Sequence, residues 1–200
     1  MPLQNRVTPF GQIVAVSGHG TMMGNRGVLH DDHRRIVRPA AGKRWITCLL
    51  RYRGRRRAVM EPRRYTQLFF LDEATAFAAG HRPCAECRNE DYKRFRGFWQ
   101  ACFGGRAGAD DMDAVLDTER GRGRSKPVWQ ADIRTLPDGV YVCIEAAAYV
   151  LWRDELVAWG DTTYGSRLPR AQFSAVDVLT PQSIAAVFAA GYITGVHPSL

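Results

Sequence analysis

The sequence has few lysines, few cysteines and no long apolar segment. These absences exclude a lysine-based positive charge, a regular disulfide framework and a membrane span. Only three of the 28 basic residues are lysine, so arginine carries almost all of the positive charge. The five cysteines form an odd, scattered set, which excludes a regular disulfide framework and is typical of a reducing compartment. No run of about eighteen apolar residues is present to span a membrane, and the first residues lack the apolar core of a signal peptide. We therefore expect a cytoplasmic protein without a membrane partner.

The apolar content that is present suffices for a globular fold. The 200 residues are 46% hydrophobic and 10% aromatic, enough for one sizeable core or two small ones. Strand patterns and helical patterns both occur, so we predict an α+β fold with short antiparallel strands. We divide the chain into three segments, which form one compact unit or two lobes: residues 1–65, 66–126 and 127–200.

Positive charge is concentrated in one segment. The formal net charge is +8, yet residues 34–64 contain twelve basic residues and a single acid, Glu61, for a net charge of +11. The other 169 residues therefore sum to −3. A basic stripe on a nearly neutral body is the electrostatic footprint of a polyanionic partner. The basic residues are Arg34, Arg35, Arg38, Lys43, Arg44, Arg51, Arg53, Arg55, Arg56, Arg57, Arg63 and Arg64.

Within this stripe we predict an arginine-rich β-hairpin. Residues 45–53 and 55–60 have the composition of two strands that turn near Gly54. Alternation along a strand would place arginines on one face, and guanidinium groups bind phosphate oxygens in pairs. The leading hypothesis is a nucleic-acid-binding protein, with DNA favoured over RNA. Its contacts to the phosphate backbone would come from Arg51, Arg53, Arg55, Arg56 and Arg57.

Two other interpretations of the basic stripe stay open. A high ratio of arginine to lysine also follows from the base composition of a genome, and the stripe would then be a solvated surface. Base composition does not, however, explain why the arginines cluster. The second possibility is that the basic face meets an acidic protein.

The most specific pattern lies in residues 69–88. An aromatic pair ends a short predicted strand, and an alanine-rich helix follows. Asp72 is placed to cap the start of this helix, and Gly80 to end it in the left-handed conformation. A Cys-x-x-Cys turn, stiffened by Pro83, then opens a second helix.

This run resembles the second half of the zinc-binding domain of the Ada family, bacterial proteins of alkylation repair and response. The resemblance covers about a tenth of the chain, from the aromatic pair to Cys84-x-x-Cys87. It implies an Ada-like knuckle with a zinc site of four cysteines, but the positions of the first pair hold Arg53 and Arg57 here. We therefore expect the scaffold without the family's transfer of a methyl group to a first-pair cysteine.

The cysteines are the candidate metal ligands. A structural zinc site needs four nitrogen or sulfur ligands in tetrahedral geometry. Cys84 and Cys87 supply two, and Cys48 is a weaker candidate on the preceding predicted strand. A histidine would complete the set, from among His30, His33 and His81. The spacing is compatible with one zinc ion at most, and two alternatives stay open: reduced thiols that stabilise a tight turn, or a redox pair.

A glycine-rich stretch near the N-terminus concentrates polar groups. Residues 12–17 are predicted as a short strand, and residues 18–27 follow as a loop with four glycines. Histidines beside carboxylates exchange protons near neutral pH or bind a divalent metal. The alternative function is therefore a hydrolase acting on nucleic acid or nucleotides, such as a nuclease or a base-processing repair enzyme. Its candidate catalytic residues are His19, Arg26, His30 and Asp31; the plainer interpretation is a loop of turns with surface histidines.

Helices and a β-meander are predicted for the rest of the chain. Residues 90–102 have helical spacing of apolar residues, with Cys102 on the inner face, and residues 109–119 form an acidic helix. A last helix starts after its predicted cap, Thr180, and stops at Gly191. The meander precedes this helix, with strands at residues 140–145, 148–152, 155–160 and 173–179.

Overall fold

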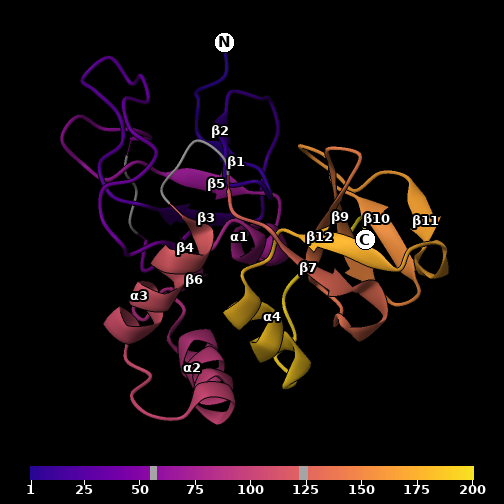
Figure 1. Ribbon diagram of the computed structural model, residues 1–200. Coiled ribbons are helices and arrows are strands. Elements are labelled where there is room, and N and C mark those ends of the chain that lie inside the picture. Colours follow the sequence, from indigo (N-terminus) through magenta and orange to yellow (C-terminus); the bar gives the residue numbers. More distant parts are fainter. Residues whose placement is uncertain (55–57, 122–125) are drawn as a thin grey trace.

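Two six-stranded sheets lie on either side of a group of helices (Figure 1). The computed structural model describes residues 1–54, 58–121 and 126–200. The predicted α+β class is confirmed. The helices are α1 (Glu73–Ala78), α2 (Asn89–Phe103), α3 (Ala109–Arg120) and α4 (Gln182–Ala189), with two 3₁₀ turns at Ile133–Thr135 and Arg170–Gln172.

Sheet one is mixed and comes from the first half of the chain. Its strand order is β2-β1-β5-β3-β4-β6. The β1–β5 and β4–β6 pairs are parallel, and the others are antiparallel. The strands are β1 (Arg6–Val7), β2 (Ile13–Val14), β3 (Met22–Asn25), β4 (Ile46–Cys48), β5 (Leu68–Phe70) and β6 (Arg82–Pro83).

Sheet two contains the predicted meander and is antiparallel throughout, in the order β11-β10-β9-β8-β12-β7. The four predicted strands are confirmed as β8, β9, β10 and β12. The two edge strands, β7 and β11, were not predicted, because edge strands lack the regular apolar alternation of a half-buried strand. The strands are β7 (Trp129–Asp132), β8 (Tyr141–Ile144), β9 (Ala147–Trp152), β10 (Glu155–Ala158), β11 (Arg167–Pro169) and β12 (Ala175–Val178).

Helix α1 lies at the centre of the molecule, and all six of its residues are buried. Its predicted ends are confirmed: the Asp72 carboxylate accepts a hydrogen bond from the Thr75 amide at 2.8 Å, and Gly80 follows the helix with φ of +85°. Ala76 packs with the core of sheet one, whereas Ala74 packs with residues of sheet two. An alanine-rich helix is what this position requires, because small side chains let both sheets approach closely.

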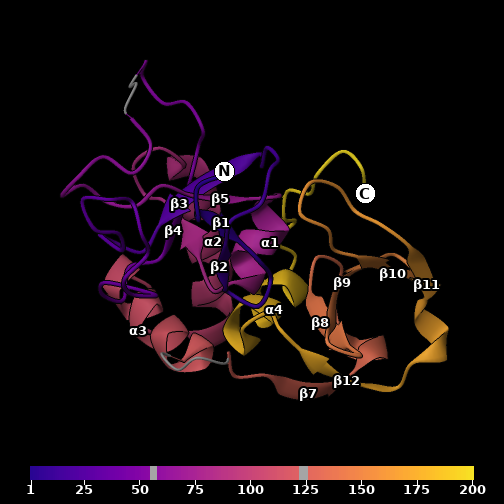
Figure 2. The same ribbon diagram turned by 90° about the horizontal axis from the view of Figure 1, so that it is seen from above.

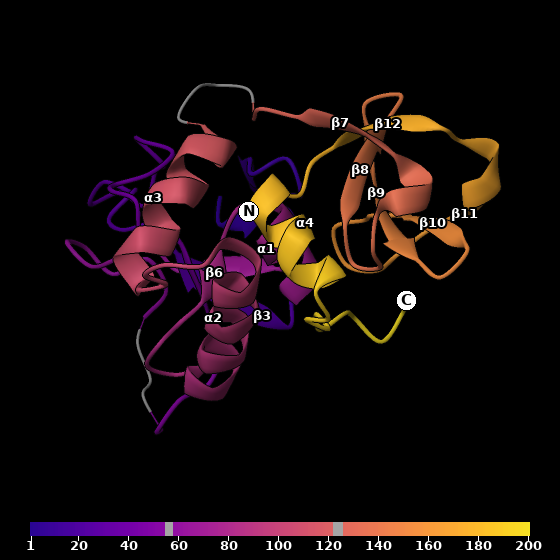
Figure 3. The ribbon, with the colours of Figure 1, turned by 60° about the horizontal axis from the view of Figure 1, so that its bottom comes forward.

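The larger helices cover the same centre. Helix α2 buries Tyr92, Phe95 and Trp99 as predicted, but Cys102 is exposed. Helix α4 packs against α2 and lies between it and sheet two (Figure 3). Thr180 does not cap α4, because its hydroxyl accepts a hydrogen bond from the Tyr141 amide. Within the described part of the chain, no helix has both the length and the apolar surface needed to cross a membrane.

One continuous core links segments that the sequence separates. The largest cluster of buried side chains includes Phe77 of α1, Phe95 of α2, Leu116 of α3 and Val142 of β8. It therefore crosses from residues 66–126 into residues 127–200. Sheet one likewise takes β5 and β6 from the middle segment and its other strands from the first.

The predicted arginine hairpin is not formed by the described residues. Strand β4 ends at Cys48, and Ala58, Val59 and Met60 are not in a strand. Both edges of β4 are already paired, with β3 on one side and β6 on the other. Strand β4 thus takes its partners from elsewhere in the chain, whereas Arg55, Arg56 and Arg57 of the predicted hairpin lie outside the described residues.

The glycine-rich stretch is also not simply a loop, because β3 runs through it as an inner strand of sheet one. A side chain at Gly24 would place its Cβ 2.2 Å from the Ile46 carbonyl oxygen, and one at Gly20 would lie 1.8 Å from the Phe70 carbonyl oxygen. These glycines permit close approach of neighbouring strands.

Candidate functional site

Three cysteines meet where β4 and β6 pair. The parallel pairing sets Thr47 opposite Pro83, and the Cys84 amide donates to the Thr47 carbonyl at 2.9 Å. Cys48 thereby comes beside the Cys-x-x-Cys turn. The sulfur atoms of Cys48, Cys84 and Cys87 all lie within 4.8 Å of one another.

The three sulfurs form a donor set that suits a soft metal ion. Tetrahedral zinc thiolates have metal–sulfur distances of about 2.3 Å, which separates their sulfurs by roughly 3.8 Å. The observed separations reach that geometry with small side-chain movements. Hydrogen bonding among the thiols divides the protons unevenly: it raises the pKa of Cys48, the donor, and lowers the pKa of Cys84, the acceptor. A thiolate is the form that binds metal.

None of the three candidate histidines belongs to this cluster. The His30 ring bonds to the Thr66 hydroxyl at 2.6 Å and to the Glu61 carbonyl, and His33 is exposed. His81 is fully buried, with its ring 5.2 Å from that of Trp45. Burial and nearby cations lower the pKa of His81, so its ring is neutral. Among the described residues, this cluster therefore offers three sulfur ligands to a metal ion.

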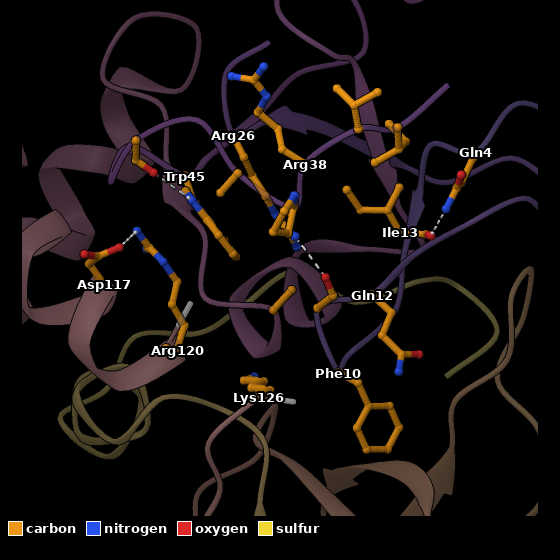
Figure 4. Close-up of a pocket in the computed structure, with 18 residues that line it drawn as sticks. Gln4, Phe10, Gln12, Ile13, Arg26, Arg38, Trp45, Asp117, Arg120 and Lys126 are labelled. Atoms are coloured by element: carbon orange, nitrogen blue, oxygen red, sulfur yellow. Dashed lines mark hydrogen bonds and ion pairs between the residues drawn. The ribbon is translucent and has the colours of Figure 1, made fainter. Parts of the chain in front are cut away.

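A second feature is a pocket of about 650 Å³ beside α1 and α3 (Figure 4). Its inner wall holds three cations, Arg26, Arg120 and Lys126, with the ring of Trp45. Trp45 lies between the two guanidinium groups, which are 3.8 Å and 4.2 Å from the ring centroid. Its other walls are largely apolar and include Phe10, Ile13, Ile36, Val37 and Pro39.

The candidate catalytic residues do not converge on this pocket. Of His19, Arg26, His30 and Asp31, only Arg26 lines it. His19 is exposed, and the Asp31 carboxylate binds Arg35 and the amide of His33. His30 is buried against Thr66. The structure therefore does not bring these four residues together at one site.

The basic stripe forms an exposed surface on the loops that flank sheet one, on the side away from sheet two (Figure 2). Nine of its twelve basic residues are described, and all nine are exposed. Two of them bind carboxylates, Arg35 with Asp31 and Arg44 with Asp110. The predicted phosphate-binding residues Arg51 and Arg53 are both exposed, whereas Arg55, Arg56 and Arg57 lie outside the described residues.

Backbone geometry presents three of these arginines at turns. Arg34, Arg53 and Arg63 have φ of +62°, +50° and +60°. Residues with a side chain rarely adopt this left-handed conformation, and it costs of order 1 kcal/mol or more. Such strain gathers at sites where the position of a side chain matters.

Sequence reasoning missed Trp45, Arg120 and Lys126 as site residues. Arg120 ends a helix with many charges, and Lys126 sits in a glycine-rich basic stretch, so both are expected in solvent. What distinguishes them is that Arg120 is buried and Lys126 half-buried, and burial of a charged side chain is a tertiary property.

Comparison of the chain with protein-family models, with curated proteins and with solved structures gave no match.

Proposed function

We propose that the protein binds nucleic acid, DNA in preference to RNA, through phosphate contacts from its basic surface. The observation that supports this is a set of exposed cations without counter-charges. Seven of the nine described basic residues in the stripe have no carboxylate partner among the described residues: Arg34, Arg38, Lys43, Arg51, Arg53, Arg63 and Arg64. Like charges held this close repel one another, and phosphates relieve that repulsion.

The dependence of binding on salt tests this proposal. On duplex DNA each phosphate contact contributes a slope of about −0.9 to log K against log salt, because counterions are released. Replacing Arg51 and Arg53 with alanine is expected to flatten the slope by about two units. Fluorescence anisotropy of a labelled duplex across a series of salt concentrations gives the measurement.

A matched control removes the same charge elsewhere. Arg134 and Arg153 are exposed and lie on the sheet-two side of the molecule. The variant Arg134→Ala with Arg153→Ala is expected to retain the wild-type slope. Affinity that does not depend on salt, or equal slopes for the two double variants, would contradict the proposal.

We further propose that Cys48, Cys84 and Cys87 hold one zinc ion. Cys84 and Cys87 occupy the positions that resemble the second cysteine pair of the Ada domain. A thiolate set around zinc would fix the start of α2 to the edge of sheet one. Both first-pair Ada positions are arginines here, and Cys48 replaces only one of the two missing thiols. The remaining coordination site is therefore left to solvent or to a further ligand.

Metal analysis of protein purified without added metal is expected to give about one zinc per chain. Cys84→Ser together with Cys87→Ser is expected to abolish the zinc and lower the Tm, since site binding contributes folding free energy. Cys102→Ser is the control, because Cys102 is exposed and outside the cluster. Absence of zinc from the wild type, even after refolding with Zn²⁺, would leave the thiols as a turn or a redox pair.

A further inference from the structure

The inner wall of the pocket has more positive than negative charge. Arg26 and Arg120 are 1% and 3% exposed, and Lys126 completes the group. One carboxylate, Asp117, lines the same pocket and lies 3.4 Å from Arg120. Arg38 also lines the pocket, so the described lining residues comprise four cations and one anion, with a net charge of about +3.

Arg26 lines the pocket and has unused hydrogen-bonding capacity. Its Nε donates to His81 at 3.2 Å and its Nη1 to the Gly11 carbonyl at 2.9 Å. Its Nη2 is buried and has no hydrogen-bond partner among the described residues. A buried guanidinium that meets only neutral acceptors and an aromatic ring is costly, because desolvation is not offset by an opposite charge.

The other two cations are held by backbone carbonyls. Arg120 donates to the carbonyls of Gly80 and Lys43, at 3.1 Å and 2.5 Å. The Lys126 ammonium donates to the carbonyls of Ala78 and Pro9. Carbonyl contacts position these side chains while neutralising none of their charge.

Burial and mutual repulsion lower the pKa values of two of these cations, Arg26 and Lys126. Burial and the charge of Arg120 lower the pKa of Arg26 to about 9. Burial and the charge of Arg26 lower the pKa of Lys126 to about 7. An anion in the pocket would relieve both effects, since an opposite charge favours the protonated forms.

We propose that this pocket binds a phosphate monoester, with its phosphoryl group on Arg26, Arg120 and Lys126 and its organic part against the apolar wall. A dianionic phosphoryl group matches the net charge of the wall better than a single carboxylate does. The pocket also has the size of sites that enclose small organic ligands. This inference goes beyond nucleic-acid binding and does not depend on it.

Two sources supply such a group, a free mononucleotide or the phosphorylated end of a strand. Isothermal titration separates them with inorganic phosphate, a nucleoside and its 5′-monophosphate, and an oligonucleotide with or without a 5′-phosphate. Binding of the monophosphate but not of the nucleoside identifies a free small ligand. A preference for the 5′-phosphorylated oligonucleotide, with no binding of the monophosphate, identifies a strand end.

The decisive variant is Lys126→Met, which removes a charge and keeps an apolar side chain of similar length. We expect it to weaken phosphate-ester binding at least tenfold, and Arg26→Met to do the same. Lys93→Met is the matched control, since Lys93 is exposed on α2 and pairs with Glu90 outside the pocket. Circular dichroism and Tm establish that each variant is folded.

The pH dependence provides a second readout. Between pH 7 and 9 a phosphate monoester stays dianionic, whereas Lys126 in the free protein loses its proton. The charged groups that line the pocket with Lys126 are Arg26, Arg38, Arg120 and Asp117, and the neutral ring of His81 is also near it. Affinity is therefore expected to fall as pH rises, by up to about tenfold per pH unit, and Lys126→Met is expected to remove most of this dependence.

No saturable binding of phosphate, monophosphate or 5′-phosphorylated strand at constant ionic strength would overturn the inference. Equal affinity for wild type and Lys126→Met would also overturn it. A failure of the nucleic-acid proposal can be told apart from a failure of this one. The variant Arg51→Ala with Arg53→Ala tests only the salt slope on duplex DNA and leaves the pocket residues unchanged.

Discussion

Replacement of Asp113 by alanine is expected to lower the free energy of unfolding by about 3–5 kcal/mol. Arg82 on β6 and Asp113 on α3 form a bidentate pair, with contacts of 2.9 Å and 2.6 Å and side chains that are 4% and 2% exposed. Alanine would leave the Arg82 guanidinium buried without its counter-charge. Urea unfolding followed by circular dichroism measures the loss.

The chain contains a matched control for this experiment. Arg44 and Asp110 form a pair of similar geometry whose side chains are 73% and 74% exposed. Asp110→Ala is expected to cost less than about 1 kcal/mol, because water screens an exposed pair.

A double variant separates the loss of attraction from the cost of an orphaned charge. Arg82→Met with Asp113→Leu is expected to recover more than half of the stability that Asp113→Ala loses, since no unpaired charge stays buried. This account would be contradicted if the unfolding free energy of Asp113→Ala lay within about 1 kcal/mol of the wild-type value. It would also be contradicted if the double variant were less stable than Asp113→Ala.

Replacement of Asp72 by alanine is expected to cost roughly 3 kcal/mol, from a lost helix cap and buried donors left without an acceptor. One carboxylate oxygen accepts from the amide and the hydroxyl of Thr75, at 2.8 Å and 2.7 Å. The other accepts from the Tyr164 hydroxyl at 2.6 Å and from the His197 amide at 2.9 Å. Asp72 therefore joins α1 to sheet two and to the C-terminal tail.

Two graded variants test whether the effect comes from these bonds. Tyr164→Phe removes one donor and is expected to cost about 1 kcal/mol. Asp72→Asn keeps an oxygen that accepts from Thr75 but places an NH₂ group, which cannot accept, against the Tyr164 hydroxyl and the His197 amide. Its cost in unfolding free energy should therefore fall between those of Tyr164→Phe and Asp72→Ala. Amide hydrogen exchange at His197 should accelerate in Asp72→Ala and stay near wild type in Tyr164→Phe. Unchanged exchange at His197 in Asp72→Ala would show that the tail is held by other contacts.

The local elements of this protein were predictable because their signals are short-range. The cap at Asp72 and the glycine stop at Gly80 define α1 within a few residues. The spacing of Tyr92, Phe95 and Trp99 fixes the buried face of α2. Period-two alternation identifies the inner strands of sheet two, but this signal is weak at the edge strands β7 and β11.

Strand partners were not predictable in the same way. Residues 45–53 and 55–60 satisfy a hairpin pattern, yet β4 pairs with β3 and β6, which are distant in sequence. Main-chain hydrogen bonds are the same for any partner, so the choice depends on which edges the rest of the fold leaves available. The grouping of Cys48 with the Cys-x-x-Cys turn follows from that choice.

The sequence by itself determined the α+β class, the capped helix α1 before the Cys-x-x-Cys turn, and the concentration of arginine in residues 34–64. These depend on composition, caps and periodicity, which act over a few neighbouring residues. Only the tertiary structure decided that Cys48 joins Cys84 and Cys87, and that Arg26, Trp45, Arg120 and Lys126 line one pocket. The physical reason is that burial decides what a charged side chain does, and burial depends on the packing of segments up to a hundred residues apart.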